Sequence, residues 1–396
     1  MIEMGFRMGF LNLSDPPPKP KRVVDYDSPS PTLTFDQRIE RDLKESPPRG
    51  WSRTYLFLLI ALVPLLVSLL RPAKKYDVQE RLAHTLARLS VKDQVKIGAE
   101  FAKNKQSIEK LLMALPDHRI EEAHVGRDSW IHWFYAAAAA SVFYWFLVLV
   151  FPSSRATPQE LLRTGVFTGT IGMLLLLLFQ FAAAATQGAW PIPTGAVSFI
   201  FSVIFYILKF FGYSYTAALN PASGLFLSWM GFTFGVGFCE ETCKMMPLVR
   251  HFRYKGTLDW RGACMWGMAS GVGFGISEGI SYASGYNGIQ TAGIYAVRFI
   301  SCVALHAIWS GAAAITLFER QDSVQESNTG FLEFRWRLFK IIAVPMILHG
   351  LYDTALKKEM NGLALLVALF SFCWVAFQVE RMCRLEAHIR VAAMAV

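Results

Sequence analysis

Apolar stretches separated by short polar connections fill most of this chain of 396 residues. A helix needs about 20 mainly apolar residues to cross the hydrocarbon core of a bilayer, and nine stretches approach that length. They predict an all-α fold, a polytopic membrane helical bundle with about 8–9 transmembrane helices. The first stretch is short, and the fourth begins among prolines. The nine cover residues 55–70, 130–151, 164–186, 192–211, 224–249, 262–282, 293–318, 338–356 and 363–379.

Four consecutive stretches, the fifth to the eighth, contain ionisable side chains. Burying one such group in a bilayer costs roughly 3 kcal/mol on insertion scales. One case often reflects a misplaced boundary, but four in succession favour one shared intramembrane site. The candidate residues are Glu240, Glu241 and Lys244 in the fifth stretch, Glu278 in the sixth, His306 in the seventh, and His349 and Asp353 in the eighth.

The fifth stretch combines two glutamates with a lysine. Adjacent residues of a helix point about 100° apart, so Glu240 and Glu241 do not face the same spot. Lys244 follows them at i+4 and i+3 and can pair with either. We expect one glutamate to react and the other to supply a charge or hydrogen-bond partner. The alternative is a helix end at the membrane surface whose charged side chains reach the headgroups.

The other three stretches add an acid and two imidazoles. Glu278 has no Lys or Arg nearby in its own stretch, so its partner must come from another helix. Asp353 follows His349 at i+4 and could hold its imidazole in one tautomer, whereas His306 alone would more often be a packing residue. Together these groups could activate a water, or bind a divalent metal such as zinc through nitrogen and oxygen ligands. The zinc pattern H-E-x-x-H is absent, and we favour a site without a cofactor.

Composition and charge placement support the membrane interpretation. The chain is 53% hydrophobic and 17% charged, against about 25% charged residues in soluble proteins. The net charge of +9 gathers in segments 250–261, 320–340 and 381–390, which lie on one side of nine spans. This placement predicts a protein of the cell membrane whose C-terminus lies in the cytoplasm. It also argues against nucleic acid as a partner. Nine spans put the N-terminus outside, although its tail is also basic; a miscounted early span would remove that conflict.

The chain divides into segments of different composition. We expect a disordered N-terminal tail (1–53), a first span (54–71), a soluble amphipathic helical insert (72–128), spans two to four (129–211), a core of spans five to nine with the site (212–380), and a cytoplasmic tail (381–396). The insert reads as two helices broken near Gly98 and Pro116. Glycines at i+4 spacing from Gly267 to Gly279 predict close helix packing in the core.

The ordered set of motifs in the core resembles the PrsW family of bacterial intramembrane proteases. These proteases are of glutamic type and related to the CAAX prenyl endopeptidases. The match covers about residues 224–356, and one motif departs from the prenyl enzymes, which have His where this chain has Glu278; a prenylated peptide is therefore not the expected substrate. The four motifs are Glu240-Glu241-x-x-Lys244, Phe274-x-x-x-Glu278, His306-x-x-x-x-Gly311 and His349-x-x-x-Asp353.

This resemblance implies hydrolysis of a membrane protein within the lipid bilayer, in the best-known case an anti-sigma factor. It implies that the first glutamate of the pair and a residue of the second motif activate water, and that a later His motif supports the oxyanion. We therefore expect Glu240 as general base, Glu278 as acid or second base, and access for water from the basic side. Three alternatives remain: a zinc metallopeptidase using the same residues, a proton-coupled transporter, and a non-catalytic binding scaffold.

Overall fold

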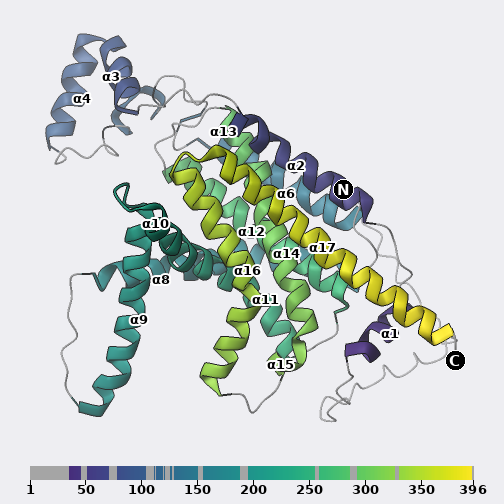
Figure 1. Ribbon diagram of the computed structural model, residues 1–396. Helices are drawn as coiled ribbons and strands as arrows, with labels where there is room; N and C mark the ends of the chain where they lie inside the picture. The colour runs from purple at the N-terminus through teal and green to yellow at the C-terminus, as the bar shows by residue number, and fades with distance from the viewer. Residues whose placement is uncertain are drawn as a thin grey trace, which may run out of the picture.

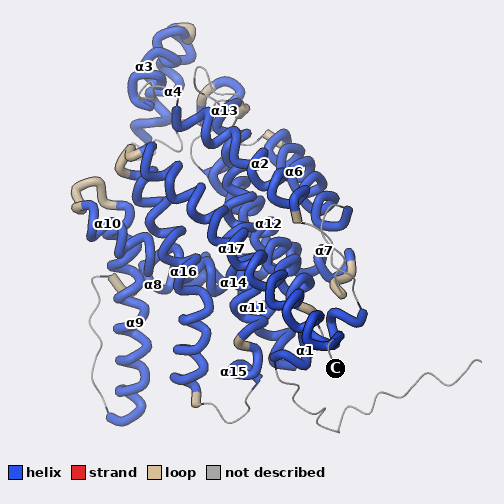
Figure 2. The backbone as a smooth tube through the Cα atoms, turned by 45° about the vertical axis from the view of Figure 1, so that its right-hand side comes forward, coloured by secondary structure: helices blue, strands red, loops and turns tan. Residues whose placement is uncertain are grey.

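The computed structural model describes residues 35–45, 51–70, 78–103, 111–149 in part, 155–187, 195–254, 258–285, 292–325 and 330–394. Within these ranges every regular element is a helix and none is a strand (Figure 2). The predicted polytopic helical bundle is therefore confirmed. Seven of the described helical segments are long and apolar enough to cross a membrane: Ser52–Leu70, Ile131–Leu149, Pro158–Ala185, Phe201–Leu219, Gly293–Glu319, Leu332–Lys357 and Asn361–Ala392.

The helices follow one another along the chain as Figure 1 shows. Their order is α1 (Phe35–Glu45), α2 (Ser52–Leu70), α3 (Val78–Arg88), α4 (Val91–Lys103), η1 (Pro116–His118), α6 (Ile131–Leu149), α7 (Pro158–Phe167), η2 (Thr168–Gly172), α8 (Met173–Ala185), α9 (Gly195–Leu219), α10 (Leu225–Gly231), η3 (Phe232–Gly237), α11 (Phe238–Tyr254), α12 (Trp260–Gly285), α13 (Ala292–Ala296), η4 (Val297–Cys302), α14 (Val303–Glu319), α15 (Gln321–Gln325), α16 (Phe331–Lys357) and α17 (Asn361–Met394).

Two predicted spans, 224–249 and 262–282, are helical but are not among the seven apolar helices. They correspond to the continuous segment α10–η3–α11 and to α12. Helix α12 packs against α6, α7, α11 and α14, so neighbouring helices cover it on several sides. This cover allows it to be more polar than a helix that faces lipid.

Glycines let α12 and α14 approach until their backbones touch. A Cβ added at Gly267 would collide with the carbonyl oxygen of Ser310, and one at Gly271 with that of His306. One turn further, a Cβ at Gly275 would lie 2.9 Å from Cδ2 of His306. The predicted close packing along this glycine face is confirmed, and it fixes the backbone that carries His306.

Ion pairs and ring contacts bring the three basic segments to one end of the bundle, which we call the basic end. Arg261, at the start of α12, pairs with Glu386 on α17 at 2.5 Å, and Arg381 pairs with Glu319 at the end of α14. Trp51 stacks on Trp260. At the opposite end, here the far end, Lys358 donates to the carbonyl of Ser223 and Asn361 to that of Leu69.

The expected disordered tail contains a helix. Helix α1 packs with Ile39 fully buried and Arg38 paired to Asp322 at 2.5 Å, because its apolar and charged residues fall on different faces. Residues 1–34 and 46–50 lie outside the described residues. The segment after the last span is also helical, since α17 continues to Met394 and docks Glu386 on α12.

These contacts also correct the expected side of the N-terminus. Helices α1 and the start of α2 lie at the basic end with the C-terminal helix, not opposite to it. The expected alternation of direction from one span to the next fails between α8 and α9. Gln187, just after α8, donates to the carbonyl of Gly212 near the end of α9. Both helices thus end near the far end, and their connection (188–194) lies outside the described residues.

The segment between α2 and α6 contains α3 and α4, which both views place at the far end (Figures 1 and 2). The predicted break near Gly98 is wrong, because α4 runs through it to Lys103. The break comes earlier, at Ser90, whose hydroxyl accepts the backbone N–H of Asp93 and caps α4. At Pro116 the chain turns into the 3-10 helix η1.

Candidate functional site

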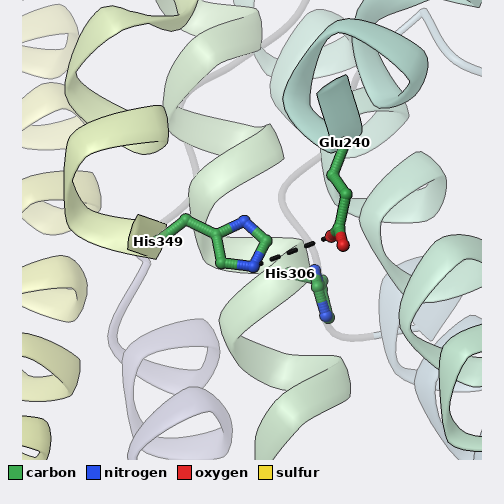
Figure 3. A group of neighbouring side chains, drawn as sticks. All are labelled: Glu240, His306 and His349. Carbon is green, nitrogen blue, oxygen red and sulfur yellow. Dashed lines mark ion pairs between the residues drawn. The ribbon is translucent and has the colours of Figure 1, made fainter. Parts of the chain in front are cut away.

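The seven predicted residues converge from four helices near the middle of the bundle. Helix α11 supplies Glu240, Glu241 and Lys244, α12 supplies Glu278, α14 supplies His306, and α16 supplies His349 and Asp353. Figure 3 shows Glu240, His306 and His349 pointing toward one another from three different helices. The structure therefore brings the ionisable residues of all four stretches into one cluster, with none of the seven left outside it.

A chain of short polar contacts links three of these helices through Lys244. Its ammonium donates to Oε1 of Glu241 at 2.8 Å and to Nδ1 of His306 at 2.7 Å. An ammonium has only donors, so Nδ1 of His306 accepts and the imidazole proton sits on Nε2. That nitrogen donates to Oε2 of Glu278 at 2.7 Å. The partner of Glu278 is thus on another helix, as its isolation in the sequence indicates.

His349 lies among three carboxylates. Its Nδ1 donates to Oε1 of Glu241 at 3.0 Å, and its Nε2 is 3.6 Å from Oε2 of Glu240 and 3.4 Å from Oδ2 of Asp353. The ring stacks on Trp309, with 4.4 Å between centroids. Glu241 and Trp309 therefore fix the orientation of His349, while Nε2 stays available for a further partner.

The two glutamates play different parts in this network. Glu241 is fully buried, and one of its oxygens receives both Lys244 and His349. The side chain of Glu240 is 7% exposed, and its Oε2 has no hydrogen-bond partner among the described residues, although Lys244 lies 3.5 Å away. Oε2 of Glu241 likewise has no hydrogen-bond partner within the described part of the chain. What distinguishes the two glutamates is that Oε1 ties Glu241 to Lys244 and His349, whereas Glu240 is slightly exposed.

Several features that support the site could not be predicted from the sequence. The ammonium of Lys244 lies 4.5 Å from the ring centroid of Phe274, and Ser270 donates to the carbonyl of Lys244. Short π-helices, η3 and η4, directly precede α11 and α14. A π-helix shifts the faces of the following helix and is frequent at functional sites, but it leaves no periodic mark in the sequence.

The cluster is more open toward the far end than toward the basic end. Asp353 and Glu278, which lie nearest the far end, are 24% and 18% exposed. On the basic side, Lys244, Met245 and Leu248 are fully buried. This burial contradicts the expectation that water reaches Glu240 from the basic side.

Glu240, His306 and His349 could hold a metal ion by donor type, since their ligand atoms lie within 4.8 Å of one another. Two histidines and a glutamate are a known set for catalytic zinc. Lys244, however, already contacts Nδ1 of His306 and lies 3.5 Å from Oε2 of Glu240. A divalent ion would share these donors with a fixed ammonium at short range, where like charges repel strongly. The three residues fit zinc in donor type and spacing, but the contact of Lys244 with His306 does not fit a bound ion.

Comparison with known proteins identifies one family. The family described as "PrsW family intramembrane metalloprotease" matches residues 189–379, a range that contains all seven site residues. No curated protein matches the chain, and no solved structure matches it.

Proposed function

Because residues 189–379 match the family of PrsW intramembrane metalloproteases, we propose that the chain is an intramembrane endopeptidase that cleaves a membrane protein with a water activated by Glu240. The observation that carries this proposal is that Oε2 of Glu240 has no hydrogen-bond partner among the described residues and lies in a slightly exposed side chain beside charges from four helices. A general base needs a free acceptor held within reach of a water and of the reacting carbonyl. Each glutamate has an Oε2 without a partner in the described structure, but Glu240 is the better candidate because its side chain is 7% exposed, whereas Glu241 is fully buried and its Oε1 receives both Lys244 and His349.

In the proposed reaction Glu240 takes a proton from water as the water oxygen attacks the peptide carbonyl carbon. The tetrahedral intermediate then collapses, the C–N bond breaks, and the leaving amine receives a proton. The products are a new carboxyl group and a new amine. A positioned base of this kind contributes typically about 10²- to 10⁴-fold to the rate.

His349 is the proposed donor to the developing oxyanion and to the leaving amine. In its imidazolium form both ring nitrogens donate, one to Glu241 and the other into the space between Glu240 and Asp353. Preorganised donors stabilise the transition state without the cost of reorienting solvent. Asp353 orients this imidazole, as its i+4 position suggests.

Lys244, His306 and Glu278 form the supporting charge network. Lys244 keeps one positive charge beside the glutamate pair, and His306 connects it to Glu278. Both ring nitrogens of His306 already have partners. Its proposed part is therefore to hold Lys244 and Glu278 in place and to relay protons between them, rather than to bind substrate. Glu278, being partly exposed, is the proposed second acid or base.

The proposed orientation follows from the grouping of the basic segments. The basic end carries the Arg-rich segments, so we assign it to the cytoplasm and the C-terminus with it. The more open side of the cluster then faces the opposite compartment. The resemblance suggests an anti-sigma factor as substrate, and nothing in the described residues selects it.

The test compares full-length wild-type protein with the Glu240→Gln variant, both reconstituted in liposomes with a single-span model substrate. Mass spectrometry of the products locates the cleaved bond. We expect cleavage within the span by the wild-type protein and a loss of about 10²- to 10⁴-fold in the variant. Equal turnover by the two proteins would remove Glu240 from the mechanism.

A zinc-dependent peptidase is the second candidate, favoured by the ligand trio and by the family description. It requires Lys244 to leave His306, so the arrangement described above favours the metal-free site. Elemental analysis of the purified protein separates the two candidates. About one zinc per chain, lost in His306→Ala, would favour the metal-dependent enzyme.

A further inference from the structure

Tyr282 and Arg298, together with Asp353 of the cluster, form a layer on the far-end side of the site. Tyr282 lies one helical turn beyond Glu278 on α12, and Asp353 one turn beyond His349 on α16. Arg298 lies on η4, two turns before His306 on α14. A peptide that approaches the cluster from its open side meets this layer first.

Arg298 carries the positive charge of this layer, and its N–H donors are available to a ligand. Its guanidinium lies 3.7 Å from the centroid of the Tyr282 ring. It forms no ion pair or hydrogen bond with any described residue. The stack on Tyr282 holds the planar group in one orientation, so its five N–H donors form a fixed fork.

The nearby acids do not take up these donors. Glu278 accepts from His306, and Asp353 lies 3.4 Å from Nε2 of His349. A cation inside a membrane protein is costly and usually marks a functional position. A guanidinium with an open fork in such a place suits a carboxylate, which it binds through two parallel hydrogen bonds.

We propose that Arg298, stacked on Tyr282, forms a substrate subsite that binds a carboxylate on the far-end side of the scissile bond. The inference rests on the proposed function, because it assigns specificity to that same site. The carboxylate belongs either to an Asp or Glu side chain or to a free C-terminus of the substrate. Hydrogen bonds to charged groups add enough affinity to favour an acidic substrate by roughly 10- to 100-fold over its amide.

Binding to an inactive protein tests the subsite separately from cleavage. Full-length Glu240→Gln protein in liposomes is titrated with labelled single-span peptides that differ only by Asp or Asn at successive positions beyond the scissile region. A second pair of peptides ends there in a free acid or an amide, which identifies the source of the carboxylate. The measured quantity is the ratio of the two dissociation constants within each pair.

We expect a ratio of roughly 10 to 100 in at least one pair. Adding Arg298→Gln should bring the ratio close to one, and Arg298→Glu should favour a Lys peptide over the Asp peptide. The control is Lys357→Gln, an exposed cation at the end of α16, which should leave the ratio unchanged. Arg298→Lys, which keeps the charge and loses the fork, should give an intermediate ratio.

Equal binding of both members of every pair, or a preference that persists in Arg298→Gln, would overturn the subsite. Those outcomes leave the proposed function intact if the wild-type protein still cleaves. Conversely, a carboxylate preference in a protein that cleaves no substrate would retain the subsite and reject the peptidase.

Discussion

Replacing Gly275 by alanine should disable the site by moving His306 rather than by unfolding the bundle. The new Cβ would lie 2.9 Å from Cδ2 of His306 and 3.0 Å from Cα of Val303, whereas ordinary contacts begin at 3.4 Å. The imidazole or the helix must therefore move by at least about 0.5 Å. His306 is held at 2.7 Å by both Lys244 and Glu278, so this movement disturbs both contacts.

The expected loss of activity follows from that displacement. A misplacement of about 1 Å in a catalytic site can cost about 10²-fold in rate, so we expect a loss of roughly tenfold or more for Gly275→Ala. Overpacking a core costs typically about 1–3 kcal/mol of stability. The assay is cleavage in liposomes together with thermal unfolding of the same preparations.

Gly279→Ala is the matched control. It lies one turn further on the same face of α12, and its Cβ would meet the ring of Phe299 at the same 2.9 Å. Phe299 is not part of the catalytic cluster, so this variant should lose comparable stability and keep most of its activity. Equal activities of the two variants would show that the position of His306 does not matter and would refute the reasoning.

Two further predictions concern the charge network and the topology. Glu241→Gln should abolish cleavage and also lower the free energy of unfolding by about 3–5 kcal/mol, because it leaves the buried Lys244 without its closest carboxylate. Thermal unfolding measures this loss, and a variant as stable as the wild type would argue against this role of Glu241. In intact cells, an impermeant thiol reagent should label Lys357→Cys at the far end and spare Tyr254→Cys at the basic end; the reverse pattern would invert the proposed orientation.

The shared site could be predicted because a bilayer makes each ionisable group costly. Glu278 is the only carboxylate and His306 the only histidine in its stretch, and the structure pairs them with each other at 2.7 Å. The spacing of His349 and Asp353 likewise placed both on one face of α16. What the sequence could not supply was the division between Glu240 and Glu241, which depends on how Lys244 and His349 approach from neighbouring positions.

Other features were hidden by their position along the chain. Arg298 lies near the start of an apolar stretch, where a charged residue is easily taken for the membrane boundary; its neighbour Tyr282 comes from another helix. Helix α1 was missed because its short amphipathic pattern follows a proline-rich segment. The predicted side of the N-terminus was wrong because counting spans assumes that successive stretches cross the bundle in opposite directions. Helices α8 and α9 break that rule.

In the proposed mechanism Glu240 activates water in a site whose fixed cation is Lys244, not a metal ion. The most direct measurement is the rate of cleavage of a model membrane substrate by purified wild-type protein, with and without a strong chelator, alongside the zinc content of the same sample. We expect an unchanged rate and no stoichiometric metal. A rate abolished by the chelator and restored by added zinc would contradict it.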